Sequence, residues 1–170
     1  MRGVRGGFAG QPIAVPPQLH ARFVPGATVA SYLPIAGEID PAPLVNAALA
    51  AGCRIALPHV VDKPTPIRFL AGEGPLVPGP FGLTQPAEDA EPLDPALILT
   101  PLVAFDRAGN RLGWGAGHYD RAFAQYPNAW RVGVAWSVQE VDALTPDTWD
   151  VPLHAIVTEL EWIEPMTLQR

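Results

Sequence analysis

Three glycines at alternate positions mark the segment of this chain that is best suited to bind a charged ligand. Gly113, Gly115 and Gly117 lie in the run RLGWGAGHYD, which extends from Arg111 to Asp120. Glycine lacks a Cβ and tolerates positive φ, so the backbone N–H groups of such a loop can approach a ligand closely. Successive N–H groups followed by a helix N-terminus form a cradle for an anion. The pattern predicts a phosphate site, with a simple strand-to-helix turn as the alternative.

Side chains beside these glycines strengthen that prediction. Arg111 offers a planar guanidinium, whose N–H groups match phosphate oxygens better than a lysine does. Asp120, in the first turn of a predicted helix over 119–125, either interacts with the helix dipole or holds a divalent metal ion. Trp114, between two glycines, is placed to stack on a planar ligand, although an ordinary packed tryptophan is the alternative. Together they indicate a nucleotide-phosphate site.

The elements that must position this turn follow an alternation of strands and helices. Residues 28–33 and 54–57 are short apolar runs typical of strands, and Pro58 ends the second. Between them, Asp40 and a proline in the first turn predict a helix over 41–51 that stops at the following glycine. A strand, a helix and a strand at this spacing indicate an α/β fold with a parallel sheet and a right-handed crossover. Further strands are predicted at 67–70 (an edge strand), 96–105, 130–136 and 155–158.

Composition and charge limit the remaining possibilities. The chain has 170 residues, 48% of them hydrophobic and 16% charged, which is typical of one globular domain. Its net charge of −6 argues against a nucleic-acid-binding surface, and no apolar run approaches the roughly 20 residues of a membrane span. Cys53 is the single cysteine, so we expect a buried thiol in a cytoplasmic protein. Pro101, inside the predicted strand 96–105, demands a bulge or an edge position.

The domain boundaries follow from where periodic patterns begin and end. Residues 1–26 contain four prolines and show no helical or strand pattern, so we expect an irregular or partly disordered lead-in. Residues 27–164 are predicted to form a single α/β domain, followed by a C-terminal tail at 165–170. The stretch 72–95 is punctuated by Gly, Pro and acidic residues, and is expected to be a long surface excursion. It serves either as an ordered pocket wall or as a mobile lid.

Beyond the glycines, several blocks of this chain resemble the 5-formyltetrahydrofolate cyclo-ligase family, also called 5,10-methenyltetrahydrofolate synthetases. The resemblance is carried by residues 102–106 with 111–121, which read LVAFD and RLGWGAGHYDR. Further blocks lie at 32–34 with 37–40, 56–58, 78–82 and 132–135. These collinear blocks span about Ala27 to Glu159, which makes the resemblance more specific than a single motif would be.

The resemblance implies a three-layer α/β/α fold with a mainly parallel, Rossmann-like sheet on a NagB/RpiA/CoA-transferase-like scaffold. It implies that ATP and Mg²⁺ drive the cyclisation of 5-formyltetrahydrofolate to 5,10-methenyltetrahydrofolate, with release of ADP and phosphate. In this family the formyl oxygen attacks the γ-phosphate, N10 then closes the ring, and phosphate leaves. The partners are therefore expected to be ATP and 5-formyltetrahydrofolate, and the enzyme a cytoplasmic monomer or weak homodimer.

The resemblance also implies roles for residues of this chain. Arg111 and Glu38 are the expected catalytic residues, and the expected ATP-binding stretch is Arg111, Leu112, Gly113, Trp114, Gly115, Ala116, Gly117, His118 and Tyr119. The expected substrate contacts are Leu33, Glu38, Trp114, Gly115, Ala116, Gly117 and His118, and the expected magnesium ligands are Asp120 and Asp150. The alternative for Glu38 is a solvated loop carboxylate, and the alternative for Asp150 is a surface or capping role.

Two departures from the family pattern keep other functions open. Family members begin with a helix bearing lysine and arginine that contributes phosphate contacts, whereas residues 1–26 carry Arg2, Arg5 and Arg22 without helical spacing. His118 also stands where the family has the first of two aromatic residues, and adds a pH-sensitive group near the phosphates. The alternatives are a weakened or non-catalytic relative that binds folate or nucleotide, and another enzyme on a similar scaffold, such as a sugar-phosphate isomerase or an acyl-CoA-handling protein.

Overall fold

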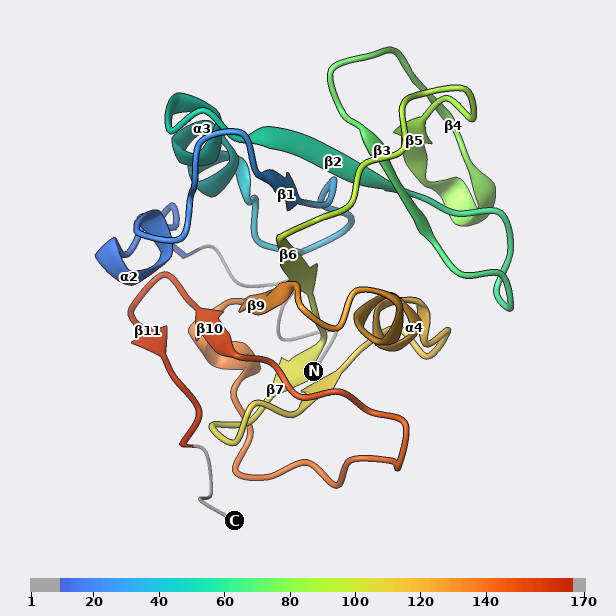
Figure 1. Cartoon of the computed structure of the whole chain (residues 1–170). Helices are drawn as coiled ribbons and strands as arrows, with labels where there is room; N and C mark the ends of the chain where they lie inside the picture. Colours follow the sequence, from blue (N-terminus) through green and yellow to red (C-terminus); the bar gives the residue numbers. More distant parts are fainter. Residues whose placement is uncertain (1–9, 167–170) are drawn as a thin grey trace.

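A mainly parallel sheet forms the centre of the protein, as the computed structural model of residues 10–166 shows (Figure 1). Within these residues it has seven strands in the order β11-β10-β9-β6-β1-β2-β3. Neighbouring strands are parallel except at the two edges, where β3 and β11 run antiparallel to β2 and β10. The strands are β1 (Thr28–Ala30), β2 (Arg54–His59), β3 (Arg68–Ala71), β6 (Leu97–Pro101), β9 (Trp130–Val134), β10 (Ala155–Val157) and β11 (Trp162–Ile163). The α/β class predicted from the sequence is confirmed.

Helices cover the two faces of the sheet, because side chains of successive strand residues point to opposite faces. In β6, Leu97 and Leu99 pack in one apolar cluster with Leu44 of α3 (Ala42–Ala50). Ile98 lies between them in the strand and packs in a second cluster with Phe123 of α4 (His118–Gln125). The sheet therefore has an apolar core on each of its two faces. The turn before α4 lies at an edge of the sheet.

The helix predicted over 41–51 is present as α3, with the signals that the sequence suggests at its two ends. Asp40 Oδ1 accepts a hydrogen bond of 2.9 Å from the backbone N–H of Ala42, the first helical residue. Beyond the helix, Gly52 takes a φ of +89°, a conformation that glycine adopts without strain. The crossover between β1 and β2 thus forms from local sequence signals. The predicted buried thiol of Cys53 follows directly, and its Sγ donates to the Val24 carbonyl at 3.3 Å.

Both expectations based on prolines inside strands are wrong. Pro101 lies in β6, a central strand between β9 and β1, and is tolerated because β6 ends at this residue. Pro58 does not end β2, which continues to His59. Strand β1 pairs with β2 only as far as Ala56, so Pro58 has a hydrogen-bonded neighbour on the β3 side alone. A missing N–H is harmless where a strand has an open side.

The second half of the predicted strand 96–105 belongs to a separate hairpin. β7 (Ala104–Phe105) pairs with β8 (Arg111–Leu112) around a turn that is organised by Asp106. The Asp106 carboxylate accepts hydrogen bonds from the backbone N–H groups of Ala108, Asn110 and Leu144 and from the Asn110 side chain. Burial alone would raise the pKa of Asp106, but these hydrogen bonds together hold it below its ordinary value. A charged, fully bonded carboxylate thus fixes the hairpin that leads into the glycine-rich turn.

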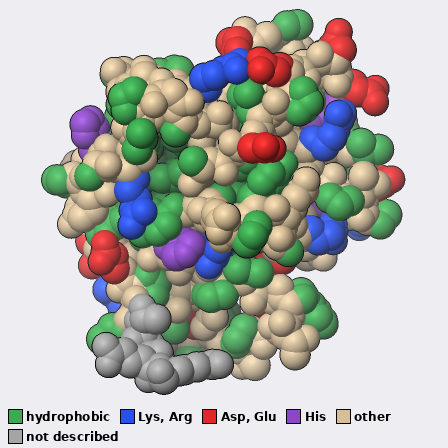
Figure 2. Space-filling model, viewed as in Figure 1, with side chains coloured by type: hydrophobic (Ala, Val, Ile, Leu, Met, Phe, Trp, Pro, Cys, Tyr) green, Lys and Arg blue, Asp and Glu red, His purple; other side chains and the backbone are tan. Residues whose placement is uncertain are grey.

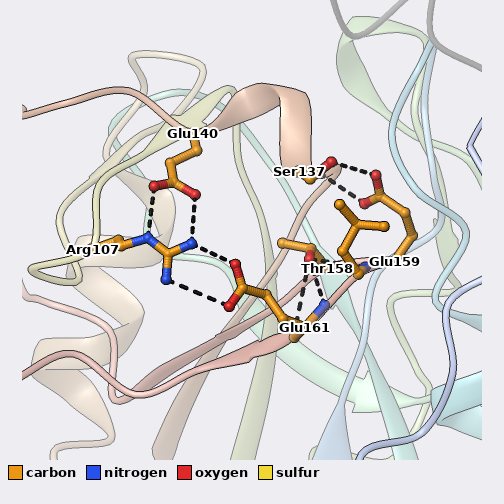
Figure 3. Close-up of polar contacts among 7 residues, drawn as sticks. Arg107, Ser137, Glu140, Thr158, Glu159 and Glu161 are labelled. Atoms are coloured by element: carbon orange, nitrogen blue, oxygen red, sulfur yellow. Dashed lines mark hydrogen bonds and ion pairs between the residues drawn. The ribbon is translucent and has the colours of Figure 1, made fainter.

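Arg107 ties this hairpin to two other segments (Figure 3). Its guanidinium forms ion pairs with Glu140, just after η2 (Ser137–Gln139), and with Glu161, between β10 and β11. Next to this fork, Glu159 accepts hydrogen bonds from the backbone N–H and the hydroxyl of Ser137 (Figure 3). These contacts join three loops on the surface, away from the cavity described below.

Two segments that the sequence left without regular structure contain short elements. Residues 72–95 include the hairpin of β4 (Leu76–Pro78) and β5 (Thr84–Pro86), joined by η1 (Pro80–Gly82), which stands beside β2 and β3 (Figure 1). The part of the lead-in that is described contains one helical turn, α2 (Pro17–His20), and buries Ile13, Leu19 and Phe23 among the core residues. Arg2 and Arg5 lie outside the described residues.

The surface carries mixed charge. On the face drawn in Figure 2, acidic and basic side chains occur in small groups of both signs, without a continuous basic stripe. No helix in the part of the chain that the structure describes is long and apolar enough to cross a membrane.

Candidate functional site

A cavity of about 480 Å³ opens where loops from the carboxyl ends of the parallel strands meet. The loop after β1, the end of β2, the glycine-rich turn, the β4–β5 hairpin and residues 147–150 form its walls. Every residue expected to take part in a site lines it: Leu33, Glu38, Arg111, Leu112, Gly113, Trp114, Gly115, Ala116, Gly117, His118, Tyr119, Asp120 and Asp150. The sequence therefore identified residues that the fold brings together around one cavity.

The glycine-rich turn exposes backbone donors to this cavity. Gly115 and Gly117 take φ values of +95° and +70°, which only glycine adopts readily. Among the hydrogen bonds of the described residues, none uses the backbone N–H of Gly115, Ala116 or Gly117 as its donor. Helix α4 begins directly afterwards at His118, so its N-terminal dipole faces the same region. This backbone can bind an anion.

Arg111 places a buried positive charge beside the turn. Its side chain is only 6% exposed, and its guanidinium lies against the rings of Phe123 and Tyr119, at 5.2 and 5.9 Å from their centroids. Nη2 forms an ion pair with Asp120 Oδ1 at 3.0 Å, and Nε has no hydrogen-bond partner among the described residues. Burial lowers the pKa of Arg111, while the charges of Asp120 and Asp150 oppose that shift. A buried guanidinium with unused N–H donors is well suited to receive a phosphate oxygen.

Glu38 is not a simple solvated loop carboxylate. Its Oε2 accepts a hydrogen bond of 3.0 Å from the backbone N–H of Ile35, and its Oε1 accepts one of 3.1 Å from Trp114 Nε1. The indole of Trp114 is 41% exposed and lines the cavity. The carboxylate and the indole therefore hold each other in position at the rim of the cavity.

His118 and Tyr119 occupy the end of the turn. The Nε2 of His118 lies 2.9 Å from the carbonyl oxygen of Asp62, in the loop between β2 and β3, so Nε2 carries the proton of a donor. The ring of Tyr119 packs against the apolar cluster around Phe123. Burial raises the pKa of the Tyr119 phenol, and the nearby Glu38 carboxylate adds to that shift. Tyr119 is therefore neutral at physiological pH.

Asp120 and Asp150 were expected to hold a metal ion. Both line the main cavity and a second one of about 10 Å³ beside Arg111. Asp150 Oδ2 also accepts from the Asp147 N–H at 2.8 Å, which is the capping role that was its alternative. Among the described residues no group of three or more His, Cys, Asp or Glu forms a ready metal cage. Two carboxylates do fit Mg²⁺, which binds one or two carboxylates together with substrate phosphates.

Several residues of the cavity were missed by reasoning from the sequence. Phe81, Leu83 and Gln85 of the β4–β5 hairpin form one wall, and the side-chain amide of Gln85 bonds to both backbone groups of Val60 at the end of β2. Phe81 is 62% exposed and has a φ of +59°, which is unusual for an aromatic residue. The glycines at positions 79 and 82 were the available signal for an unusual backbone at Phe81. Nothing in the local sequence shows which surface the hairpin faces.

Basic residues of the lead-in do not supply the phosphate contacts of the family's first helix in the described structure. The guanidinium of Arg22 lies 3.2 Å from the ring centroid of Trp130, at the amino end of β9, and Arg22 is not a lining residue of the cavity. Arg111 is thus the arginine that lines the cavity among the described residues.

Comparison with known proteins gives a consistent result. A model of the 5-formyltetrahydrofolate cyclo-ligase family matches residues 18–159. The chain is 35% identical to the 5-formyltetrahydrofolate cyclo-ligase of Escherichia coli K12 over 164 residues, covering 88% of this chain and 87% of that enzyme. It is 34% identical to the Haemophilus influenzae protein of that name, covering 76% and 74%. An NMR structure of Aquifex aeolicus 5,10-methenyltetrahydrofolate synthetase superposes with a TM-score of 0.70 at 34% identity, covering 91% of this chain and 77% of that one.

Proposed function

This chain belongs to the 5-formyltetrahydrofolate cyclo-ligase family, and we propose that its 480 Å³ cavity is where ATP meets the folate. The protein is an ATP-dependent ligase that converts 5-formyltetrahydrofolate to 5,10-methenyltetrahydrofolate. The family match favours this activity over the two alternatives drawn from the departures in sequence.

The polyphosphate of ATP binds at the glycine-rich turn. One observation carries this assignment: the buried Arg111 guanidinium has an unpartnered Nε, and it lines the same cavity as Gly115, Ala116 and Gly117, whose backbone N–H groups have no acceptor among the described residues. A buried unpaired donor such as Arg111 Nε is costly and indicates a ligand that pairs it, and the backbone N–H groups of the turn offer further donors on the lining of the same cavity. Phosphate oxygens are acceptors that match both a guanidinium fork and a row of amides.

Mg²⁺ is held by Asp120 and Asp150 together with the phosphates. When bound, the ion neutralises charge that builds up on the transferring phosphoryl group. In the structure Asp120 is paired with Arg111, and Asp150 contributes to the field around that guanidinium. Arg111 and the two carboxylates thus keep opposite charges close together in a buried corner, where both an anion and a cation can be received.

The folate binds against the apolar residues that line the cavity beside the turn. Leu33 and Trp114 offer apolar surface there, and Phe81 extends from the hairpin wall. Glu38 is fixed by the Ile35 N–H and the Trp114 indole, so it is an oriented acceptor for N–H groups of the substrate. Planar rings between aromatic side chains, with one placed carboxylate, are a typical arrangement for binding a pterin-like heterocycle.

The reaction requires the formyl oxygen of the folate to approach the γ-phosphorus of ATP in line with the bond that breaks. The formyl oxygen attacks the γ-phosphorus, and the bond from that phosphorus to the bridging oxygen of ADP breaks. N10 then attacks the activated formyl carbon and loses its proton, and phosphate leaves with the former formyl oxygen. Arg111 stabilises the negative charge on the transferring group, while Glu38 and the turn hold the reactants in position.

We further infer a three-layer, Rossmann-like scaffold of the NagB/RpiA/CoA-transferase type, because α3 and α4 pack on opposite faces of the sheet. A cytoplasmic monomer or weak homodimer is the proposed state, and the buried free thiol of Cys53 suits a reducing compartment. Sedimentation of the purified protein tests the oligomeric state.

A kinetic experiment tests the assignment of the ATP site. Formation of the methenyl product is followed by its near-ultraviolet absorbance at varied ATP for the wild type, Arg111→Lys and the control Arg107→Ala. Lysine lacks the planar fork, so we expect Arg111→Lys to raise the KM for ATP at least about tenfold. Arg107 contacts Glu140 and Glu161 and does not line the cavity, so its variant should keep the wild-type KM. An unchanged KM in Arg111→Lys would refute the assignment.

A further inference from the structure

Arg121, in the first half of α4, forms hydrogen bonds both to the glycine-rich turn and to a distant loop. Its Nη1 donates a hydrogen bond of 3.0 Å to the carbonyl oxygen of Ala116, inside the turn. Its Nη2 donates one of 2.6 Å to the carbonyl oxygen of Lys63, in the loop between β2 and β3. One guanidinium therefore joins the turn to a loop 58 residues earlier in the chain. Arg121 does not itself line the cavity.

The bond to Ala116 has a consequence for the neighbouring N–H. The described chain has no cis peptide bond, and in a trans peptide the carbonyl and the N–H point in opposite directions. Because the Ala116 carbonyl points to Arg121, the N–H of Gly117 in the same peptide plane points away from Arg121. Gly117 is a lining residue of the cavity, and this N–H has no protein acceptor among the described residues.

We propose that Arg121 is a positioning residue that locks the Ala116–Gly117 peptide with its N–H available to the phosphates of ATP. This inference rests on the proposed function of the turn as the ATP site. A flip of this peptide changes ψ of Ala116 and φ of Gly117, and it costs little because glycine tolerates either sign of φ. A flipped peptide would turn the Ala116 carbonyl toward the phosphates and repel them. Arg121 prevents the flip by holding that carbonyl.

The second bond of Arg121 adds an anchor outside the turn. The carbonyl of Lys63 belongs to the same loop as the carbonyl of Asp62, which pairs with His118 Nε2 at 2.9 Å. The turn is thus tied at two points to a loop that is itself joined to β2. The guanidinium of Arg121 holds the two carbonyl oxygens through two nitrogens in a rigid plane, whereas a lysine would offer one nitrogen on a flexible stem and a less defined geometry.

The test measures binding of Mg·ADP by calorimetry and ATP kinetics for the wild type, Arg121→Ala, Arg121→Lys and the control Arg107→Ala. Loss of a charge-assisted bond and of the locked peptide should raise the Kd for Mg·ADP about tenfold in Arg121→Ala. The Kd of Arg121→Lys should lie between those of the wild type and Arg121→Ala, because an ammonium keeps the charge and the donors but lacks the rigid planar fork. The KM for ATP should rise with Kd, kcat should change less, and added guanidinium ion should restore part of the affinity of Arg121→Ala. Arg107→Ala should bind as the wild type does.

The outcomes separate this proposal from the assignment of the ATP site. Wild-type affinity for Mg·ADP in both Arg121 variants, combined with weak binding in Arg111→Lys, would overturn the positioning role and leave the ATP site intact. Full binding in Arg111→Lys would overturn the ATP site itself. If Arg121→Ala does not fold, Arg121→Lys carries the test, and a Kd equal to that of the wild type would overturn the proposal.

Discussion

The indole Nε1 of Trp114 donates a hydrogen bond of 3.1 Å to Oε1 of Glu38, which lies 76 residues earlier in the chain. The bond joins the glycine-rich turn, which is proposed to bind the phosphates of ATP, to the loop after β1, which is proposed to contact the folate. Each partner has a second fixed point, since Glu38 is also held by the Ile35 N–H and Trp114 lies between two glycines of a turn that Arg121 grips. The two halves of the site are therefore set at a defined distance before either substrate binds.

Removing this bond while keeping an aromatic ring should affect the folate more than the nucleotide. In Trp114→Phe the Glu38 carboxylate loses the indole donor at its Oε1 and is held less firmly, and we expect the KM for 5-formyltetrahydrofolate to rise about fivefold. A matched control is Trp162→Phe, because Trp162 Nε1 also donates to a glutamate, Glu164, at 3.0 Å, but outside the cavity. Equal KM values for both variants would show that the bond has no role in binding.

Asp120 should determine how much magnesium the enzyme needs. Asp120→Asn removes one carboxylate of the proposed pair and the ion-pair partner of Arg111. We expect the Mg²⁺ concentration for half-maximal activity to rise at least about tenfold, since even outer-shell changes at metal sites cost that much affinity. Asp89→Asn, at an exposed position of the surface, is the control. If the Mg²⁺ titration of Asp120→Asn matches that of the control, Asp120 is not a ligand.

The strained backbone of Phe81 predicts a residue kept for binding rather than for stability. Asparagine accepts the left-handed conformation at φ +59° better than phenylalanine does, so Phe81→Asn should change the free energy of unfolding by no more than about 0.5 kcal/mol. The same variant loses a ring that is 62% exposed at the wall of the cavity, and its KM for 5-formyltetrahydrofolate should rise several-fold. Urea unfolding and steady-state kinetics on one preparation measure both quantities. A marked loss of stability with an unchanged KM would assign Phe81 to folding instead.

His154 should make the fold sensitive to mild acid. Burial lowers the pKa of this imidazole to about 4, with a further contribution from the positive charges of Arg131 and Arg22. Its Nδ1 accepts a hydrogen bond of 2.9 Å from the Arg131 N–H, so the folded state needs the neutral ring. The unfolded chain takes up a proton near the ordinary pKa of about 6.5. Between that pH and about 4 the unfolded state therefore binds more protons, and stability falls as the pH falls.

His154→Asn provides the measurement for this prediction. Asparagine has an acceptor oxygen near the position of Nδ1 but no group that titrates in this range. The fall in the urea midpoint between pH 7 and pH 5 should be smaller in this variant than in the wild type. Identical pH profiles would show that other groups control acid stability.

Local signals in the sequence were enough for the elements that place the site. Helix α3 was predicted from Asp40 and Gly52, and the helix after the glycine-rich turn from the turn itself, because capping and positive φ depend on neighbours along the chain. The residues of the turn and the distant Glu38 were also found, the latter through the family resemblance. All of them line one cavity.

Contacts between segments that lie far apart in the sequence could not be predicted from these local signals. Pro101 was expected at an edge because proline lacks an N–H, whereas its tolerance depends on where β6 ends. The pairing of Arg111 with Asp120, and the grip of Arg121 on Lys63, require knowing how hairpin, helix and loop approach one another. Phe81 was missed for the same reason, since only the tertiary structure shows that the β4–β5 hairpin forms a wall of the cavity.

The most direct test of the central claim observes the backbone N–H groups of the glycine-rich turn during nucleotide binding. Backbone amide resonances of the ¹⁵N-labelled protein are followed by NMR while Mg·ADP is added to saturation. We predict large shifts for Gly115, Ala116 and Gly117, because their N–H groups exchange solvent for phosphate oxygens, and a loss of these shifts at the same nucleotide concentration in Arg111→Lys. Saturable binding of Mg·ADP that leaves these three resonances unmoved would contradict the account.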